Sequence, residues 1–123
     1  MEHIKFEHIM EGPFNVLVDP PNKLKHAQNL VILRKFIRIR YNYPFINTVI
    51  KGYRSNSPDG FSLAYLAKII KEEYFQFYQE ENKIVGDSGY IFLGPYGIWE
   101  EITSFRVTGL VEEGNLFGLE IFQ

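Results

Sequence analysis

The sequence predicts one α+β domain spanning residues 1–123: an antiparallel sheet of about five to seven strands, with one long helix (about residues 62–81) packed across one face. Three observations predict this class. One long stretch has apolar residues at helical spacing, and several short stretches have strand-like patterns. Aromatic residues make up 16% of the chain, and aromatic side chains are favoured in sheets. A second core would not fit into 123 residues.

The helix is predicted to follow a turn at residues 57–60 that contains Pro58 and Gly60. Ser62 is a good N-cap, because its hydroxyl can accept a hydrogen bond from a free N–H group of the first turn. The residues that follow place one apolar face on about five helical turns. That face consists of Leu63, Leu66, Ala67, Ile70, Tyr74, Phe77 and Tyr78.

Three bulky helix residues, Tyr65, Ile69 and Phe75, lie outside this apolar face. A helix with its back in water does not need them, so either loops cover its flanks or a partner contacts them. Tyr96 and Trp99 lie on or beside a stiff turn, and such side chains are typical of binding hot spots. These five residues form the predicted protein interface. The alternative for Trp99 is that it closes one end of the core.

Three strands are predicted in the first third of the chain. Residues 2–10 alternate loosely and are predicted to form an edge strand. Residues 14–18 are a short apolar run predicted as a strand, which must end at two prolines because proline has no N–H to donate. Residues 23–33 fit either a short helix or a strand, and we favour a strand for residues 30–33.

Apolar and polar residues alternate at residues 37–43, and this period of two predicts a half-buried strand. Residues 45–53 resume an extended pattern after Pro44, so the two segments are predicted as antiparallel neighbours. After the helix, residues 90–93 form another apolar run. Residues 105–111 and 116–122 are predicted as two strands joined by a turn in which Gly and Asn allow positive φ.

Composition limits the class of protein. The chain has no cysteine, which excludes disulfides and a cysteine nucleophile. It has no signal-peptide pattern at its start and no apolar run near the ~20 residues of a membrane span. We therefore expect a soluble cytoplasmic protein without a membrane partner. Residues 1–61 carry nine Lys and Arg against five Asp and Glu, and residues 62–123 carry four against ten.

The most basic segment is a candidate nucleic-acid contact formed by Arg34, Lys35, Arg38 and Arg40. Basic residues interleaved with aromatic ones can bind phosphates and stack bases. In a strand, however, Arg38 and Arg40 point away from the side that carries Tyr41 and Tyr43, so those rings could not stack a base held by the arginines. The alternative is a solvated sheet face on which the arginines pair with carboxylates.

No motif predicts a catalytic residue, a cofactor or a metal. His3, His8 and His26 lack metal-ligand spacing, and Walker, GxGxxG and GxSxG patterns are missing from the sequence. An enzyme with an unfamiliar site is the weakest hypothesis. We would look for that site near residues 94–101, where a turn containing Gly and Pro presents large side chains.

Two segments together resemble a family of small, uncharacterised α+β domains from large DNA viruses and some plants and algae. The first is Ser57-Pro58-Asp59-Gly60-Phe61-Ser62-Leu63 with Tyr74, Tyr78 and Glu80-Glu81, and the second is Gly94-Pro95-Tyr96-Gly97-Ile98-Trp99-Glu100. The resemblance covers residues 57–123 and implies the fold without an active site. Family members often continue Trp-Gly-His, whereas this chain has Trp99-Glu100-Glu101, so any role of that histidine is missing here.

The sequence therefore favours a non-enzymatic interaction module that binds another protein or a second copy of itself. The alternative is a nucleic-acid-binding accessory protein that uses the basic segment 34–40.

Overall fold

A computed structural model describes residues 2–43, 48–85, 90–93, 98–101 and 105–122, with side chains for 2–43, 48–77, 79 and 105–122. It confirms the α+β class. The chain forms one long helix, a short 3-10 turn and nine strands among these residues. Their bounds are β1 (His3–Lys5), η1 (Pro21–Lys23), β2 (Leu30–Ile32), β3 (Phe36–Tyr41), β4 (Val49–Arg54), β5 (Phe61–Ser62), α1 (Leu63–Val85), β6 (Tyr90–Leu93), β7 (Ile98–Glu101), β8 (Arg106–Glu113) and β9 (Leu116–Phe122).

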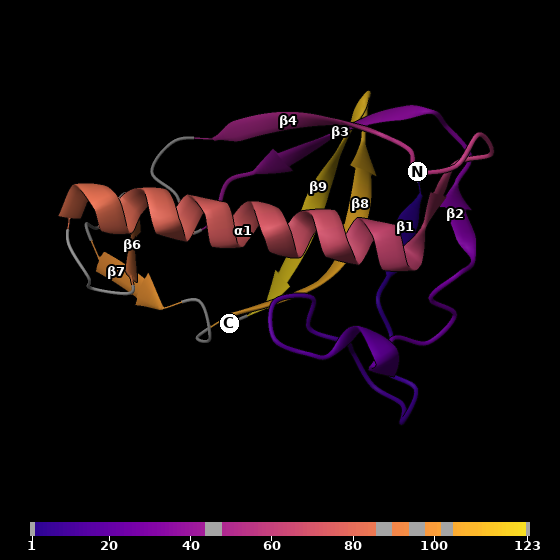
Figure 1. Ribbon diagram of the computed structural model, residues 1–123, viewed down its shortest axis with the longest axis horizontal. Helices are drawn as coiled ribbons and strands as arrows, with labels where there is room; N and C mark the ends of the chain where they lie inside the picture. Colours follow the sequence, from indigo (N-terminus) through magenta and orange to yellow (C-terminus); the bar gives the residue numbers. More distant parts are fainter. Residues whose placement is uncertain (1, 44–47, 86–89, 94–97, 102–104, 123) are drawn as a thin grey trace.

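The main sheet has five strands in the order β1-β8-β9-β3-β4, and α1 crosses one of its faces (Figure 1). All neighbouring pairs are antiparallel except β3 and β9, which are parallel where Ile39 lies beside Phe117. The parallel pair joins the hairpin β3–β4 to the hairpin β8–β9. Strands β2 and β5 form a separate antiparallel pair, as do β6 and β7.

Strand β3 confirms the predicted period of two. Ile37, Ile39 and Tyr41 are buried toward the core, whereas Phe36 is exposed and Arg38 is half-buried. β4 pairs with β3 without a break over the whole length of both strands. The C-terminal hairpin is confirmed as well, and its turn contains a glycine at φ 64°.

Helix α1 begins where its cap predicts and extends to Val85, four residues beyond the predicted end. The Ser62 hydroxyl oxygen accepts a hydrogen bond from the Tyr65 N–H at 3.1 Å, which satisfies one donor of the first turn. Leu66, Ile70 and Tyr74 are fully buried, so the predicted apolar face is the one that packs against the sheet.

Replacing Ser62 by Ala is expected to lower the free energy of unfolding by about 1 kcal/mol, because the N–H of Tyr65 then has no side-chain acceptor. Urea denaturation followed by circular dichroism measures the change. Gln79→Ala is the control, since Gln79 is an exposed position of the same helix and should change stability by less than about 0.5 kcal/mol. Equal effects of the two substitutions would contradict the assigned cap.

The prediction of a strand at residues 14–18 is wrong, because this segment forms a turn. Phe14, Val16 and Leu17 are buried whereas Val18 is exposed, and side chains help to hold the backbone of this turn. The Asn15 side-chain oxygen accepts hydrogen bonds from the N–H groups of Leu17 (3.1 Å) and Val107 (3.2 Å). The Asp19 carboxylate accepts one from the Asn15 N–H at 2.7 Å. The two bonds within residues 15–19, to Leu17 and to Asp19, are local bonds of the kind that compete with strand pairing.

Ile69 needs no partner to cover it, contrary to one of the two alternatives for this residue. It is only 8% exposed and belongs to the core. One turn before it, the Tyr65 hydroxyl donates to the Arg54 carbonyl oxygen at 3.2 Å. One turn after it, the Glu73 carboxylate accepts a hydrogen bond from the Tyr53 hydroxyl at 2.8 Å. This flank of α1 therefore faces β4.

Candidate functional site

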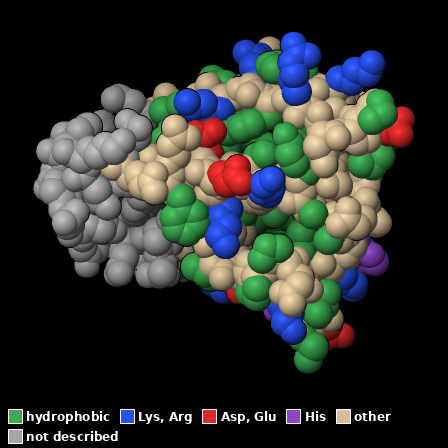
Figure 2. All heavy atoms as spheres, in the orientation of Figure 1, with side chains coloured by type: hydrophobic (Ala, Val, Ile, Leu, Met, Phe, Trp, Pro, Cys, Tyr) green, Lys and Arg blue, Asp and Glu red, His purple; other side chains and the backbone are tan. Residues whose placement is uncertain are grey.

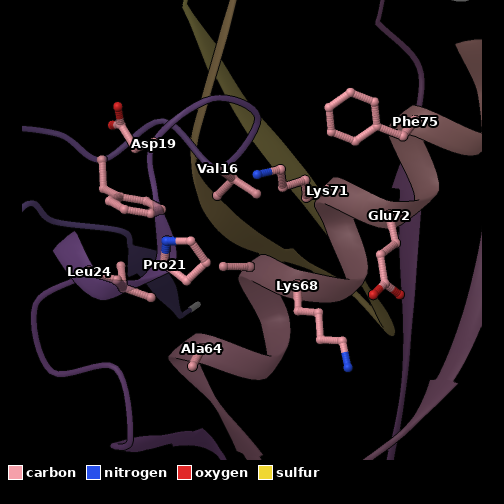
Figure 3. Close-up of a pocket in the computed structure, with 11 residues that line it drawn as sticks. Val16, Asp19, Pro21, Leu24, Ala64, Lys68, Lys71, Glu72 and Phe75 are labelled. Atoms are coloured by element: carbon pink, nitrogen blue, oxygen red, sulfur yellow. The ribbon is translucent and has the colours of Figure 1, made fainter.

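The other flank of α1 contains an apolar pocket of 460 Å³, which we call the flank pocket (Figure 3). One wall is α1 and the other is the segment 14–24, which includes η1. The pocket is within the size range of ligand and side-chain binding sites. Its lining residues are Phe14, Val16, Asp19, Pro21, Leu24, Ala64, Ala67, Lys68, Lys71, Glu72 and Phe75.

The helical wall of the flank pocket follows from sequence spacing. Ala64, Ala67, Lys71 and Phe75 lie three or four residues apart, which places them along one side of the helix. The two alanines have small side chains, so they leave a depression in the helix surface at this end. At the other end Phe75 remains 42% exposed. The same flank therefore carries a recess and a projecting aromatic ring.

Charges of both signs surround the recess. The Lys71 ammonium lies 5.9 Å from the centre of the Phe75 ring, a cation–π distance. Lys71 extends across the opening toward Val16, whereas Lys68 points away from the pocket (Figure 3). Within the described part of the chain, neither lysine lies within ion-pair distance of a carboxylate. Figure 2 shows basic, acidic and apolar side chains next to one another on this face.

The predicted interface residues differ in how far they are buried. Tyr65 is half-buried, and its ring stacks on Phe61 at 5.9 Å between centroids. Ile69 is buried, whereas Phe75 is exposed at the flank pocket. The side chains of Tyr96 and Trp99 lie outside the described residues. The sequence did not predict that residues 14–24 line one side of the flank pocket, because the apolar residues of this segment also fit a strand.

The basic segment is partly neutralised by the β8–β9 hairpin. Arg34 forms an ion pair with Glu112, and Arg40 forms one with Glu113. The hydrogen bond from Arg34 lowers the pKa of the Glu112 carboxyl, and the N–H of Glu2 lowers it further. The adjacent acidic residues at 112–113 were the signal in the sequence for these pairs.

Lys35 and Arg38 are the two predicted nucleic-acid contacts without an ion pair in the described part of the protein. Lys35 is exposed and Arg38 is half-buried on the sheet face opposite α1. The prediction that Arg38 and Tyr41 lie on opposite faces of β3 agrees with their burial.

The remaining predictions concern chemistry and membranes. Among the described residues, no three His, Asp or Glu side chains gather to hold a metal ion. The hypothetical enzyme site at 94–101 is described only as the backbone of β7, since residues 94–97 lie outside the described ranges. No helix in the described ranges is both long and apolar enough to cross a membrane.

Comparisons with protein-family models, curated proteins and solved structures found no match to this chain. The resemblance to the viral and plant domain family therefore stays a prediction.

Proposed function

We propose that this protein is a non-enzymatic module that pairs with a second copy of itself through the flank pocket and Phe75. The observation that carries the proposal is the exposed Phe75 ring beside an apolar recess on the same helix flank. A surface with both a projection and a recess can be complementary to itself when a two-fold axis relates two copies.

The spacing of residues along α1 supports an antiparallel pair of helices. A two-fold axis at the level of residue 70 brings Lys68 of one copy beside Glu72 of the other, because each lies two positions from the axis. The same axis brings Phe75 opposite the turn formed by Ala64 and Ala67, where the helix surface is low. One arrangement thus satisfies both shape and charge.

The nature of the lining supports contact over catalysis. Acid–base catalysis needs several polar groups that converge on one reacting point. The flank pocket is instead mostly apolar, with four charged residues, Asp19, Lys68, Lys71 and Glu72, among those that line it. Apolar interiors with charged rims are typical of protein interfaces.

The proposal predicts a dimer of twice the 14.4 kDa chain mass in light scattering and sedimentation equilibrium over a concentration series. Phe75→Glu should weaken association about thirtyfold or more, because it removes an aromatic anchor and places a carboxylate against an apolar wall. Phe122→Glu is the matched control: Phe122 is 50% exposed on β9, away from the pocket, and its replacement should leave the mass unchanged.

A charge exchange tests the orientation. Lys68→Glu should weaken association, because the new carboxylate faces Glu72 of the second copy. Adding Glu72→Lys in the same chain exchanges both partners and should restore association. Melting temperatures of the variants at low concentration separate this effect from a loss of folding. A chain that is monomeric at every concentration would contradict the proposal. So would a double variant that associates no more tightly than Lys68→Glu alone.

A further inference from the structure

The opposite face of the sheet exposes an aromatic ring among unpaired cations. Phe36 is 54% exposed at the start of β3. Its ring lies over Gly52 of β4, because a Cβ atom at position 52 would lie only 2.6 Å from the Phe36 ring carbon Cζ. The tip of the ring thus lies over the neighbouring strand, while the side chain as a whole stays exposed to solvent.

Three cations are neighbours of Phe36 in the strand pairing or along the chain. Arg54 is the direct cross-strand neighbour of Phe36, and Arg38 lies two residues along the same face of β3. Lys35 precedes Phe36, and Lys35 and Arg54 both line a polar hollow of 350 Å³. The other residues of this hollow are Ser55, Asn56, Ser57 and Pro58.

These cations differ from the rest of the basic segment. Arg34 and Arg40 are held by the acidic residues of the β8–β9 hairpin. In the described part of the chain, Lys35, Arg38 and Arg54 have no carboxylate within ion-pair distance. Three positive charges therefore remain uncompensated next to the open ring. Figure 2 shows Lys and Arg side chains along the upper edge of the molecule, where Figure 1 places β4.

We propose that the face formed by Phe36, Arg38 and Arg54, together with Lys35 in the adjoining hollow, binds single-stranded nucleic acid, with a base stacked on Phe36 and phosphates at the three cations. An exposed aromatic ring on a sheet is a suitable platform for an unstacked base, and cations near it neutralise the phosphates of the nucleic-acid backbone. Bases within a duplex are stacked on each other and cannot reach such a ring. The flank pocket lies on the other side of the sheet, so this proposal is independent of self-association.

The proposed binding face does not include Tyr41 or Tyr43. Both tyrosines pack with the core, whereas Phe36 lies on the same face as Arg38. The aromatic residue that accompanies the cations is therefore Phe36. The ring can take this position because residue 52 of the neighbouring strand is a glycine, which has no Cβ atom to collide with it.

Fluorescence anisotropy with labelled oligo-dT and oligo-U, and with a duplex of the same length, tests the proposal in the chain of residues 1–123. We expect single strands to bind more tightly than the duplex. The logarithm of the association constant should fall with the logarithm of salt concentration at a slope of about −2, as expected for about three phosphate contacts. Equal binding of the duplex, or no binding of single strands at low salt, would overturn the proposal.

Substitutions separate stacking from charge. Phe36→Leu keeps an apolar cover over Gly52 but removes the aromatic ring, and should weaken binding about tenfold without changing the salt slope. Arg54→Gln should weaken binding and reduce the slope by about 0.7. Phe122→Leu, an exposed aromatic position on β9, is the control and should bind as the wild type does.

Competition distinguishes nucleic acid from an acidic protein partner. Poly-glutamate carries charges but no bases, so it should displace the labelled strand poorly at equal charge concentration. Equally effective displacement by poly-glutamate, or wild-type affinity in Phe36→Leu, would identify a general anion-binding surface and overturn the assignment to single strands. Circular dichroism of each variant confirms that it is folded.

Discussion

Replacing Gly60 by Ala is expected to lower the free energy of unfolding by about 2 to 4 kcal/mol. Gly60 has φ 140°, a conformation that residues with a side chain rarely adopt. A Cβ atom there would also overlap the carbonyl oxygen of Ile32 in β2 and lie 3.0 Å from the Cα atom of Leu33. Both obstacles are backbone atoms, so relief requires β2 to move away from β5.

Gly114→Ala is the matched control for this experiment. Gly114 also has a positive φ, 64°, but a Cβ atom there would meet no atom within 4 Å. Its replacement should cost only about 1 to 2 kcal/mol, the backbone penalty of a left-handed residue. Urea unfolding of both variants, followed by circular dichroism, gives the comparison. Equal losses at the two positions would show that contact with Ile32 contributes nothing.

The stability of the protein is expected to fall steeply above about pH 10 because of a buried tyrosine. The Tyr41 hydroxyl lies 2.7 Å from that of Tyr53, which in turn donates to the Glu73 carboxylate. Burial is the main cause that raises the pKa of Tyr41 well above its usual value near 10, and the neighbouring Tyr53 and Glu73 raise it further.

The direction of the pH dependence follows from the number of protons that the folded and unfolded states bind. Below about pH 10 Tyr41 is protonated in both the folded and the unfolded state, so it contributes no pH dependence. Above that pH the unfolded chain loses this proton while the folded chain keeps it. The free energy of unfolding should therefore fall by about 1.4 kcal/mol per pH unit from Tyr41 alone.

Guanidinium unfolding at a series of alkaline pH values measures this dependence. Tyr41→Phe is the control, because it removes the titrating group and keeps the ring in the core. The difference in slope between the two proteins isolates the contribution of the Tyr41 hydroxyl, because all other ionisable groups are present in both. Identical slopes would show that the Tyr41 hydroxyl ionises in the folded state as readily as in the unfolded one.

The parts of the fold that were predictable from sequence are the local ones. The helix, its Ser62 cap, the period of β3 and the turn at Gly114 each depend on residues close together in the chain. The types of these side chains indicate the conformation of the backbone next to them. The class of the fold follows from these elements, because one long helix and several short strands pack in few ways.

The parts that were not predictable depend on residues far apart in sequence. The segment 14–18 looks like a strand until Asn15 is seen to bind Val107 across the molecule. The burial of Ile69 depends on how far β4 extends along one flank of α1. The position of the Phe36 ring depends on the register of β3 and β4, which pairs Gly52 with Arg38 and so brings it near the tip of that ring. Spacing along the chain carries no information on such pairings.

The strand order also has a consequence for how the chain reaches its folded state. β8 and β9 occupy inner positions of the sheet, although they are the last two strands in sequence. During synthesis the hairpin β3–β4 and helix α1 leave the ribosome long before their neighbours, with one edge of β3 unpaired. Contacts between Ile39 and Phe117 close a very long loop, which slows folding. A nascent chain that stops before Arg106 therefore exposes apolar core residues and an open strand edge, the features that chaperones protect.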